Sequence, residues 1–392
     1  MNHPSFRPFP RVTHAVFRRR VNRFLIECEQ EGSVLTAYLP NPGRLWELLL
    51  PESIVYLTDN RNVPGRSTGH TAVAVERDGR PVMLHTHYAN HVVKHLIDTD
   101  SLPGLPGARI LRSEVSSGGS RFDFLLRFQD EPFHLEVKSC TLFQHGIALF
   151  PDAVTARGTR HLRHLADLSR NGGRGGIVFL VNTPDARYFI PDYHTDLTFA
   201  RTLLAVKKDI LVSAVGIEWT EDLTLGPAVT DVAIPWPVIE SEVHDGGCYI
   251  LILHLPRDET IIVGGLGTLT FTRGYYCYAG SAVRHLSRRI ERHLRKRKKF
   301  FWHIDYLRDR ADSCIALPLR TRHTSEHDLA RGIGKIGGRP IPAFGSSDCT
   351  CRSHLFAMRG NPIHDRRFIS LMLDFRIAAF RGDVHRFTAQ SS

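Results

Sequence analysis

Long apolar runs and cysteines are both scarce in this chain of 392 residues. No apolar stretch approaches the ~18 residues that a membrane-spanning helix needs. The first residues, MNHPSFRPFPRV, lack the apolar core of a secretory signal peptide. The seven Cys are too few to form a disulfide framework in a chain of this length. We therefore expect a cytoplasmic protein that does not associate with a membrane.

Acidic residues are underrepresented in only one part of the chain. Residues 1–241 contain 26 Lys and Arg against 26 Asp and Glu, whereas residues 242–392 contain 25 against 14. The second part therefore carries the whole net charge of +11. A basic excess confined to one part indicates a module that faces nucleic acid, although basic faces also serve solubility and lipid contacts.

Apolar periodicity divides the first part of the chain into two kinds of structure. Short strands with Gly and Pro turns over residues 13–80 predict a small barrel. A helix over residues 86–98 and alternating strands and helices from 110 to 217 predict an α/β sheet, in which GIVFLVN is a buried strand. We expect Asp152 to be the N-cap of a helix that runs to about Arg170. Residues 219–245 are aperiodic and contain Pro, which predicts a linker.

Basic residues mark two predicted helices. The helix before Arg170 carries Arg157, Arg160, His161 and His164, which we expect to face away from its leucines. Residues 281–299 predict a second helix, whose window 284–299 holds nine Lys or Arg against one Glu. Such residues grip the nucleic-acid backbone without reading sequence, although a solvated surface has the same pattern. The expected backbone contacts are Arg18, Arg20, Arg160, Arg288, Arg292, Arg295 and Lys296.

The stretch Phe122–Thr141 predicts a β-hairpin, because two apolar-rich runs flank the polar turn 129–132. Strand alternation puts Glu136 and Lys138 on one face, and Asp123 is costly to bury among aromatics unless it is paired. Carboxylates are hard oxygen ligands for Mg²⁺, and an ammonium steadies a phosphate or activates a water. Glu114 is a third acid on the preceding strand. The local pattern alone equally describes a solvated Glu–Lys pair.

From about Ala15 to Trp219 the chain resembles the SfsA family, named for sugar fermentation stimulation. The resemblance is carried by NRFLIECEQEG, LPNPGRLWELLLPES, SRFDFLLRF, HLEVKSCTL, FPDAVTARGTRHLRHLADL and GIVFLVN. It implies an N-terminal OB-like barrel and then a restriction-endonuclease-like α/β domain. Asp123, Glu136 and Lys138 match the D…ExK nuclease signature, with Glu114 as an additional acid and Mg²⁺ as cofactor. The family usually has Glu where this chain has Ala156, so that acid is missing here.

From about Gly247 to Phe380 the chain resembles the GIY-YIG nucleases. The resemblance is carried by Gly247-Cys248-Tyr249, Tyr278-Ala279-Gly280-Ser281 and the segment RIERH over 289–293. Cys248 and Ala279 stand where Ile is usual, a departure expected to affect core packing more than chemistry. The long spacing between the two tyrosines implies an inserted hairpin.

This second resemblance implies a site around a scissile phosphate. Its members would be Tyr249, Tyr278, Arg289 and His293, of which the last two share a helix face. A downstream Glu would hold a metal ion, and Glu326 is the first candidate, with Asp305 as the second. An exposed Glu and an Asp that caps a helix or pairs with a cation are the plainer interpretations of these two acids.

Cys349, Cys351 and His354, with Cys314 as a further candidate, could form part of a zinc site. The C-x-C spacing differs from the usual C-x₂₋₄-C, and the fourth ligand is not evident from the sequence. We therefore expect buried thiols near a turn rather than zinc.

Together these patterns predict an α/β multidomain protein. We expect an OB-like barrel over 1–82, a PD-(D/E)xK nuclease-like domain over 83–222, a linker over 223–245, a GIY-YIG-like domain over 246–380 and a disordered tail over 381–392. The expected function is Mg²⁺-dependent endonuclease hydrolysis of phosphodiester bonds in DNA or RNA. The alternative is a non-catalytic DNA-binding regulator of sugar (maltose-type) metabolism genes. The sequence does not decide between a monomer and a homodimer.

Overall fold

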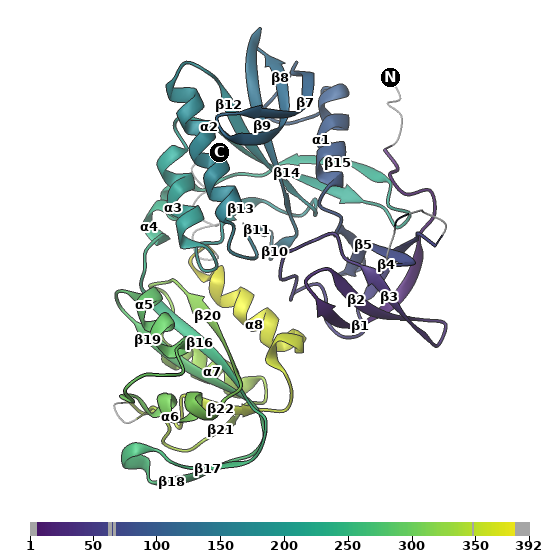
Figure 1. Cartoon of the computed structure of the whole chain (residues 1–392). Coiled ribbons are helices and arrows are strands. Elements are labelled where there is room, and N and C mark those ends of the chain that lie inside the picture. Colours follow the sequence, from purple (N-terminus) through teal and green to yellow (C-terminus); the bar gives the residue numbers. More distant parts are fainter. Residues whose placement is uncertain (1–5, 62–64, 66–67, 347–348, 381–392) are drawn as a thin grey trace. The chain divides into compact units, whose positions relative to one another are not determined.

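The computed structural model describes residues 6–61, 65, 68–346 and 349–380, so the predicted tail over 381–392 lies outside the described residues. The chain divides into two compact units, one ending at Trp236 and the other beginning at Pro237 (Figure 1). Among the described residues, no helix has both the length and the apolar character that crossing a membrane requires.

The first unit begins with a small β-barrel. Its strands are β1 (Thr13–Asn22), β2 (Leu25–Gln30), β3 (Ser33–Tyr38), β4 (Ile54–Asp59) and β5 (His70–Arg77). They pair in the order β3-β2-β1-β4-β5, and parallel pairing of β3 with β5 closes the ring. The short β6 (Arg80–Met83) pairs with β5. Phe17, Ile26 and Leu57 help to fill the interior, and the predicted OB-like barrel is confirmed.

A six-stranded mixed sheet is the centre of the rest of the first unit. Its order is β15-β14-β12-β9-β8-β7, and β9, β12 and β14 run parallel to one another. The strands are β7 (Arg109–Ser117), β8 (Ser120–Phe128), β9 (Glu131–Cys140), β12 (Gly175–Val181), β14 (Leu211–Trp219) and β15 (Leu225–Asp231). All of β12 is buried, as its continuous apolar run predicts.

Helices cover both faces of this sheet, as Figure 1 shows. The core on one face includes apolar residues of α1 (Tyr88–Asp98). The core on the other face includes residues of α2 (Ala156–Arg170) and α3 (Leu197–Val206). The strands β10 (Leu142–Gln144), β11 (Ile147–Phe150) and β13 (Tyr188–Pro191) form a separate small sheet. The predicted mixed α/β architecture is confirmed.

The second unit is built on an antiparallel sheet in the order β20-β16-β19-β22-β21. The strands are β16 (Gly247–Leu255), β19 (Gly274–Ala282), β20 (Ser313–Leu319), β21 (Arg339–Pro340) and β22 (Leu355–Met358). The helices are α5 (Leu286–Leu294), α6 (His303–Arg310), α7 (Glu326–Lys335) and α8 (Arg366–Arg376), and α4 (Trp236–Glu242) begins at the boundary between the units. The hairpin of β17 (Glu259–Ile262) and β18 (Thr268–Phe271) confirms the predicted insertion.

The predicted linker is wrong in its structure, because residues 225–231 form β15 and residues 236–242 form α4. The presence of Pro227 made this segment look unlike a strand. Proline is tolerated on an edge strand, where one side needs no backbone donor, and β15 is the edge of its sheet.

Two predicted helices also have wrong boundaries. The basic helix is shorter than expected, because β19 extends to Ala282 and α5 ends at Leu294. The run of like charges that follows has no apolar face to bury, and neighbouring like charges destabilise a helix. In α2 the N-cap is Thr155, whose side chain accepts from Gly158 N at 3.1 Å. Asp152 instead accepts a hydrogen bond from Leu45 N at 3.2 Å.

Candidate functional site

The predicted hairpin sets the register of the acidic residues. Strands β8 and β9 are joined by Gln129 and Asp130, both with positive φ, which is the two-residue turn that matches the twist of paired strands. The strand β9 then presents Val137 N to Asp123 Oδ2 at 2.8 Å. From α1, Asn90 Nδ2 donates to Asp123 Oδ1 at 2.7 Å. Two donors therefore fix the orientation of this carboxylate.

Burial raises the pKa of Asp123 above its ordinary value, and the charge of Glu136 raises it further. The bonds from Val137 and Asn90 act in the opposite direction without cancelling this shift. The charge of Glu136 affects the pKa of Asp123 because the two carboxylates share one poorly solvated region.

Glu136 is 2% exposed, and only one of its two carboxylate oxygens has hydrogen-bond partners among the described residues. Its Oε1 is bonded by Lys138 Nζ and lies 2.5 Å from His161 Nδ1. Its Oε2 is buried and has no hydrogen-bond partner among the described residues. Burial by itself would raise the pKa of Glu136, but the hydrogen bond from His161 and the charge of Lys138 keep it below the ordinary value.

This arrangement fits a divalent cation. The carboxylates of Asp123 and Glu136 supply hard oxygen ligands. Burial of Glu136 Oε2 without a hydrogen-bond partner costs free energy, and coordination of an ion would offset that cost. Lys138 Nζ lies beside the same carboxylate and carries the positive charge that a phosphate needs. The predicted association of Glu136 with Lys138 on one face of a strand is therefore present.

Glu114 and Ala156 contribute less to this arrangement. The Glu114 carboxylate pairs with Arg121, and its side chain is 66% exposed. This ion pair lowers the pKa of Glu114. The partner of the Glu114 carboxylate is therefore Arg121 rather than a residue of the Asp123 and Glu136 site. Ala156 is the exposed first residue of α2.

Two residues of this site, His161 and Asn90, were not predicted from the sequence. His161 was expected on an exposed basic face, which is wrong, since it is 1% exposed and contacts Glu136. Its position four residues before Leu165, a core residue of the same helix, is the signal that could have predicted its burial. Asn90 carries no comparable signal, because its role depends on how α1 docks on the sheet.

In the second unit, Tyr249 is the buried centre of the predicted tyrosine–histidine site. Its hydroxyl lies 2.9 Å from His293 Nε2, and burial raises its pKa well above the ordinary value. Tyr249 pairs across the sheet with Gly280, where an added Cβ would lie 2.4 Å from the hydroxyl oxygen. Only glycine at position 280 therefore leaves room for the ring, which explains the Tyr–Ala–Gly sequence on β19.

The remaining predicted members lie around this tyrosine. The ring of Tyr278 has its centroid 6.5 Å from that of Tyr249. Arg289 donates from Nη1 to Ser281 O at 2.7 Å, and its guanidinium lies over the Trp302 ring. Cys248 and Ala279 are buried at 2% and 0%, as expected for core positions.

Asp305 organises a buried ion cluster. It is fully buried, and its carboxylate lies 2.9 Å from Lys298 Nζ and 3.0 Å from Arg292 Nη2. It also accepts from the backbone N of Phe301 and Trp302, which caps α6. Burial alone would raise its pKa, but hydrogen bonds from the neighbouring donors hold it far below the ordinary value. The plainer interpretation of Asp305, an aspartate that caps and pairs, describes this geometry.

Glu326 is the first residue of α7 and lines a cleft of about 560 Å³. The same cleft is lined by Cys248, Ser281 and Arg284. The negative charge of Glu326 contributes to the raised pKa of Tyr249, so the two residues belong to one electrostatic neighbourhood. Of the two predicted metal-binding acids of this unit, Glu326 is the one that opens to a cleft.

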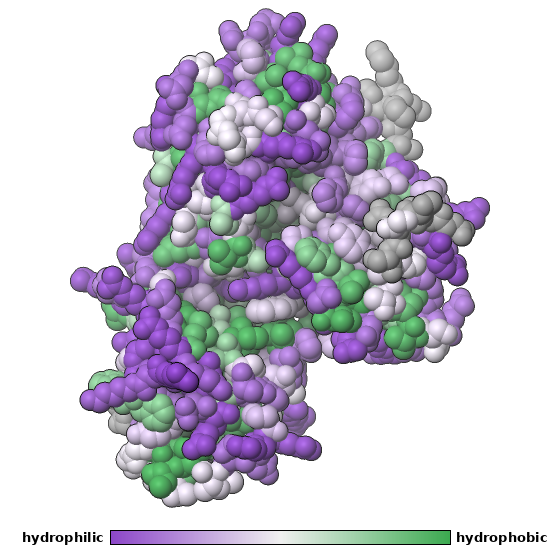
Figure 2. All heavy atoms as spheres, in the orientation of Figure 1, coloured by the Kyte–Doolittle hydropathy of each residue, from purple (hydrophilic) through white to green (hydrophobic). Residues whose placement is uncertain are grey.

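The predicted backbone-binding residues differ in how available they are. Arg160, Arg288, Arg295 and Lys296 are exposed, and Figure 2 shows hydrophilic residues gathered over the face of the second unit that carries α5. Arg292 is paired with Asp305. In the barrel, Arg18 pairs with Glu29 and Glu52, and Arg20 donates to the carbonyls of Gly43 and Arg44 at 2.6 and 2.8 Å.

Three families match this chain. Residues 19–84 match the SfsA N-terminal OB domain, and residues 87–222 match the sugar fermentation stimulation protein RE domain. Residues 248–376 match the domain of unknown function DUF123.

Similar proteins match about half of this chain or somewhat more. A sugar fermentation stimulation protein homolog of Moorella thermoacetica is 40% identical over 190 residues, which are 48% of this chain and 82% of that protein. A homolog of Methanosphaera stadtmanae is 37% identical over 196 residues, 49% of this chain and 81% of that protein. The solved structure of Pyrococcus furiosus SfsA in complex with Ca²⁺ is similar with a TM-score of 0.54 and 27% identity, over 60% of this chain and 99% of that one.

Proposed function

The chain belongs to the sugar fermentation stimulation protein family, and from that premise we propose that its first unit hydrolyses phosphodiester bonds of DNA or RNA with a divalent cation. The observation that carries this proposal is the convergence of Asp123, Glu136 and Lys138, with one buried carboxylate oxygen of Glu136 unpartnered. The similar SfsA structure is described as a complex with Ca²⁺, an ion with the oxygen-ligand preference that these residues satisfy. We propose Mg²⁺ as the working ion.

Each residue has a distinct task in this proposal. Asn90 and the backbone of Val137 hold Asp123, while His161 holds Oε1 of Glu136 so that Oε2 remains available. Lys138 stabilises the negative charge that develops on the scissile phosphate. The cation supplies Lewis-acid polarisation of the phosphate and activation of the attacking water. The OB-like barrel provides a surface of a type that binds nucleic acids.

Replacing Asn90 by Ala is expected to shift the pH dependence of cleavage upward. The raised pKa of Asp123 comes chiefly from burial, and the Asn90 hydrogen bond opposes it. Without the Asn90 hydrogen bond, Asp123 keeps its proton up to a higher pH. Because the cation binds the deprotonated carboxylate, the proton then competes with the cation over a wider pH range. Cleavage rates measured between about pH 4 and pH 8 check this, a window that begins at about the ordinary Asp pKa and covers raised values of it. His91→Ala, an exposed change on α1, should leave the profile where it is, and an unshifted Asn90→Ala profile would contradict the assignment.

For the second unit we propose a nucleic-acid-binding role, with a GIY-YIG-like site formed by Tyr249, Tyr278, Arg289, His293 and Glu326. The contact between Tyr249 and His293 and the cleft beside Glu326 support this proposal. We retain the functional division into a barrel over 1–82, a cleaving domain over 83–222 and a second nucleic-acid module over 246–380.

Because fold resemblance does not guarantee chemistry, binding without cleavage is the second candidate for the whole chain, as in a DNA-binding regulator of sugar metabolism genes. The exposed basic residues around α5 favour it.

Removing the exposed charges Arg288, Arg295 and Lys296 together is expected to weaken binding of all sequences alike. If each residue neutralises one phosphate, the slope of log affinity against log salt should become shallower by about 2.7 on duplex DNA and by about 2.1 on single strands. Fluorescence anisotropy with labelled single strands and duplexes at several salt concentrations measures this slope.

The matched control removes three other exposed charges of the same unit, Arg273, Lys335 and Arg359. It changes the net charge equally and should alter the slope much less. An equal loss in both triple variants would indicate general attraction of a basic unit rather than a binding face around α5.

The proposed activity is tested by Mg²⁺-dependent nicking of single-stranded, duplex and branched substrates. Asp123→Ala and Arg289→Ala are run beside the wild type, since one alters the first unit and the other the second. Cleavage lost in Asp123→Ala alone would assign the activity to the first unit. Nucleic-acid binding by the wild type without cleavage under any of these conditions would favour the non-catalytic alternative.

A further inference from the structure

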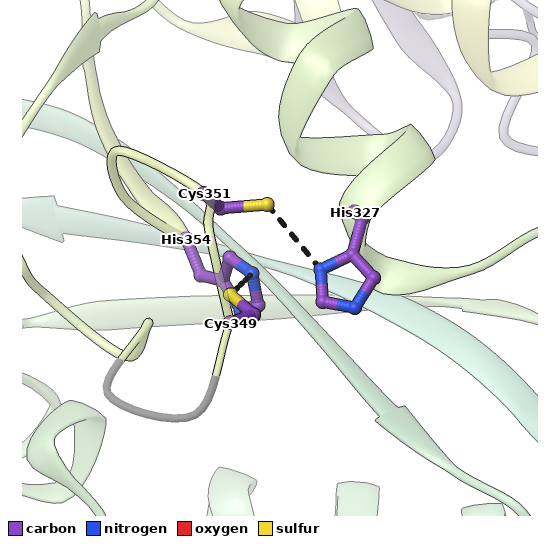
Figure 3. Close-up of side chains that lie close together, drawn as sticks. All are labelled: His327, Cys349, Cys351 and His354. Atoms are coloured by element: carbon purple, nitrogen blue, oxygen red, sulfur yellow. Dashed lines mark hydrogen bonds between the residues drawn. The ribbon is translucent and has the colours of Figure 1, made fainter.

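Four metal-ligating side chains outside the sites described above converge in the second unit (Figure 3). His327 comes from the first turn of α7, Cys349 and Cys351 from the loop between β21 and β22, and His354 immediately precedes β22. One ligand atom of each residue lies within 4.8 Å of those of the others. We propose that these residues bind a single zinc ion.

Two of the separations between ligand atoms match those of one tetrahedral ion. Cys351 Sγ is 3.3 Å from His327 Nδ1, and Cys349 Sγ is 3.5 Å from His354 Nε2. With Zn–S of about 2.3 Å and Zn–N of about 2.0 Å, tetrahedral geometry separates adjacent S and N ligands by about 3.5 Å. Both pairs therefore already stand where a shared ion would hold them.

The donor set selects zinc over the hard cations proposed for the first unit. Two cysteines and two histidines are a recurrent ligand set of structural zinc sites. Soft thiolate ligands favour zinc, whereas Mg²⁺ and Ca²⁺ take oxygen ligands. On binding, each cysteine releases its thiol proton to solvent and the two histidines coordinate as neutral imidazoles, with no change of oxidation state.

The backbone around the cluster fixes two ligands in advance. His354 is 3% exposed, its N donates to Phe344 O at 2.9 Å and its carbonyl accepts from Ala279 N at 2.9 Å. His327 lies in a helical turn whose N-cap, Ser325, forms a reciprocal capping box with Asp328. An ion held by these residues would fasten the loop carrying both cysteines to α7 and to β19.

The sequence expectation of no zinc rested on an incomplete ligand list. Cys314, the further candidate, lies on β20 opposite Leu253 and is not part of the cluster. Cys349 and Cys351 are half-buried rather than buried thiols. The missing ligand is His327, which is more than twenty positions away in sequence and on a different element, so the usual close spacing does not apply.

The zinc ion would have a structural role beside the cleft of the second unit. The loop residue Gly345 packs so closely on Tyr278 that an added Cβ would lie 3.0 Å from its ring. The residue before His327 is Glu326, which lines the cleft. A zinc ion would hold the loop that contacts Tyr278 against the first turn of α7, which carries Glu326. It would thereby position both residues whether or not the second unit cleaves nucleic acid.

The test is metal analysis of the purified full-length chain expressed with zinc. We expect about one tightly bound zinc ion per chain. Replacement by Co²⁺ should give the visible d–d bands of a tetrahedral ion together with a thiolate-to-cobalt charge-transfer band. Cys351→Ser and His327→Ala should each weaken zinc affinity by at least about a hundredfold, beyond what loss of an outer-shell partner causes. Cys314→Ser is the matched control and should retain the metal.

Hydrogen exchange keeps the test decisive if a ligand variant folds poorly. Chelation of zinc from the wild type should accelerate exchange over residues 341–346 and 349–354 and over the first turn of α7, while exchange in the barrel strands remains unchanged. A wild-type chain without stoichiometric zinc, cobalt-loaded protein without the thiolate band, or zinc loss in Cys314→Ser equal to that in Cys351→Ser would overturn the proposal. None of these results bears on cleavage by the Asp123 site, which is measured separately.

Discussion

Asp123→Asn is expected to reduce metal-dependent cleavage by about three orders of magnitude, because a bound cation supplies several kcal/mol of transition-state stabilisation. The variant removes a charged ligand and keeps the shape of the side chain. The amide oxygen of the new side chain can still accept from Val137 N. Its amide NH₂ group can donate to the oxygen of Asn90 if the Asn90 amide turns over, so both neighbours keep a hydrogen bond. Rates on one nucleic-acid substrate in Mg²⁺, for the wild type and the variant, measure the effect.

The stability of Asp123→Asn separates loss of function from loss of fold. Since burial raises the pKa of Asp123, folding favours its neutral form. The stabilising contribution of that form is present below the unfolded pKa and is lost as pH rises through the folded pKa. A permanently neutral Asn should therefore leave the free energy of unfolding of the metal-free protein at neutral pH unchanged or higher.

Asp130→Asn is the matched control for this experiment. Asp130 is exposed in the turn of the same hairpin, and its positive φ is one that Asn tolerates. It should leave cleavage unchanged. Undiminished cleavage by Asp123→Asn, or an equal loss in both variants, would contradict the proposed role of Asp123.

Asp305→Asn is expected to destabilise the second unit by about 3–5 kcal/mol, the usual cost of removing one partner from a buried ion pair. Lys298 is 6% exposed and Arg292 is 27% exposed, and both cations point at this carboxylate. Because the folded pKa of Asp305 is depressed, its contribution is present above the unfolded value and is lost as pH falls through the folded one. The second unit should therefore weaken in acid in the wild type and depend much less on pH in the variant.

Hydrogen exchange of peptides from α6, measured in the full chain, monitors this effect within the second unit. Asp309→Asn, an exposed change on the same helix, should alter exchange little, since surface ion pairs contribute about 0–1 kcal/mol. Unchanged α6 protection in Asp305→Asn would contradict the view that Asp305 holds the cluster together.

The features that were predictable from sequence are those set by local periodicity. The alternation around Glu136 and Lys138 fixed their common face, and the polar two-residue turn fixed the hairpin. The uninterrupted apolar run of β12 identified a strand covered on both sides. The tyrosine spacing likewise predicted the inserted hairpin of β17 and β18.

The features that were missed depend on contacts between distant elements. His161 meets Glu136 only because α2 packs across β9, and its burial is visible in the helical period but its partner is not. His327 and Cys351 are brought together by the docking of α7 beside a loop. The edge position that lets β15 contain Pro227 is likewise a property of the sheet rather than of the segment.

A Mg²⁺ titration of cleavage by the wild type and Glu136→Gln tests whether Asp123 and Glu136 hold the cation on which cleavage depends. We expect cleavage that saturates with Mg²⁺ in the wild type and is lost in Glu136→Gln at every Mg²⁺ concentration, with nucleic-acid binding retained. Cleavage by Glu136→Gln with an unchanged Mg²⁺ dependence would contradict this assignment.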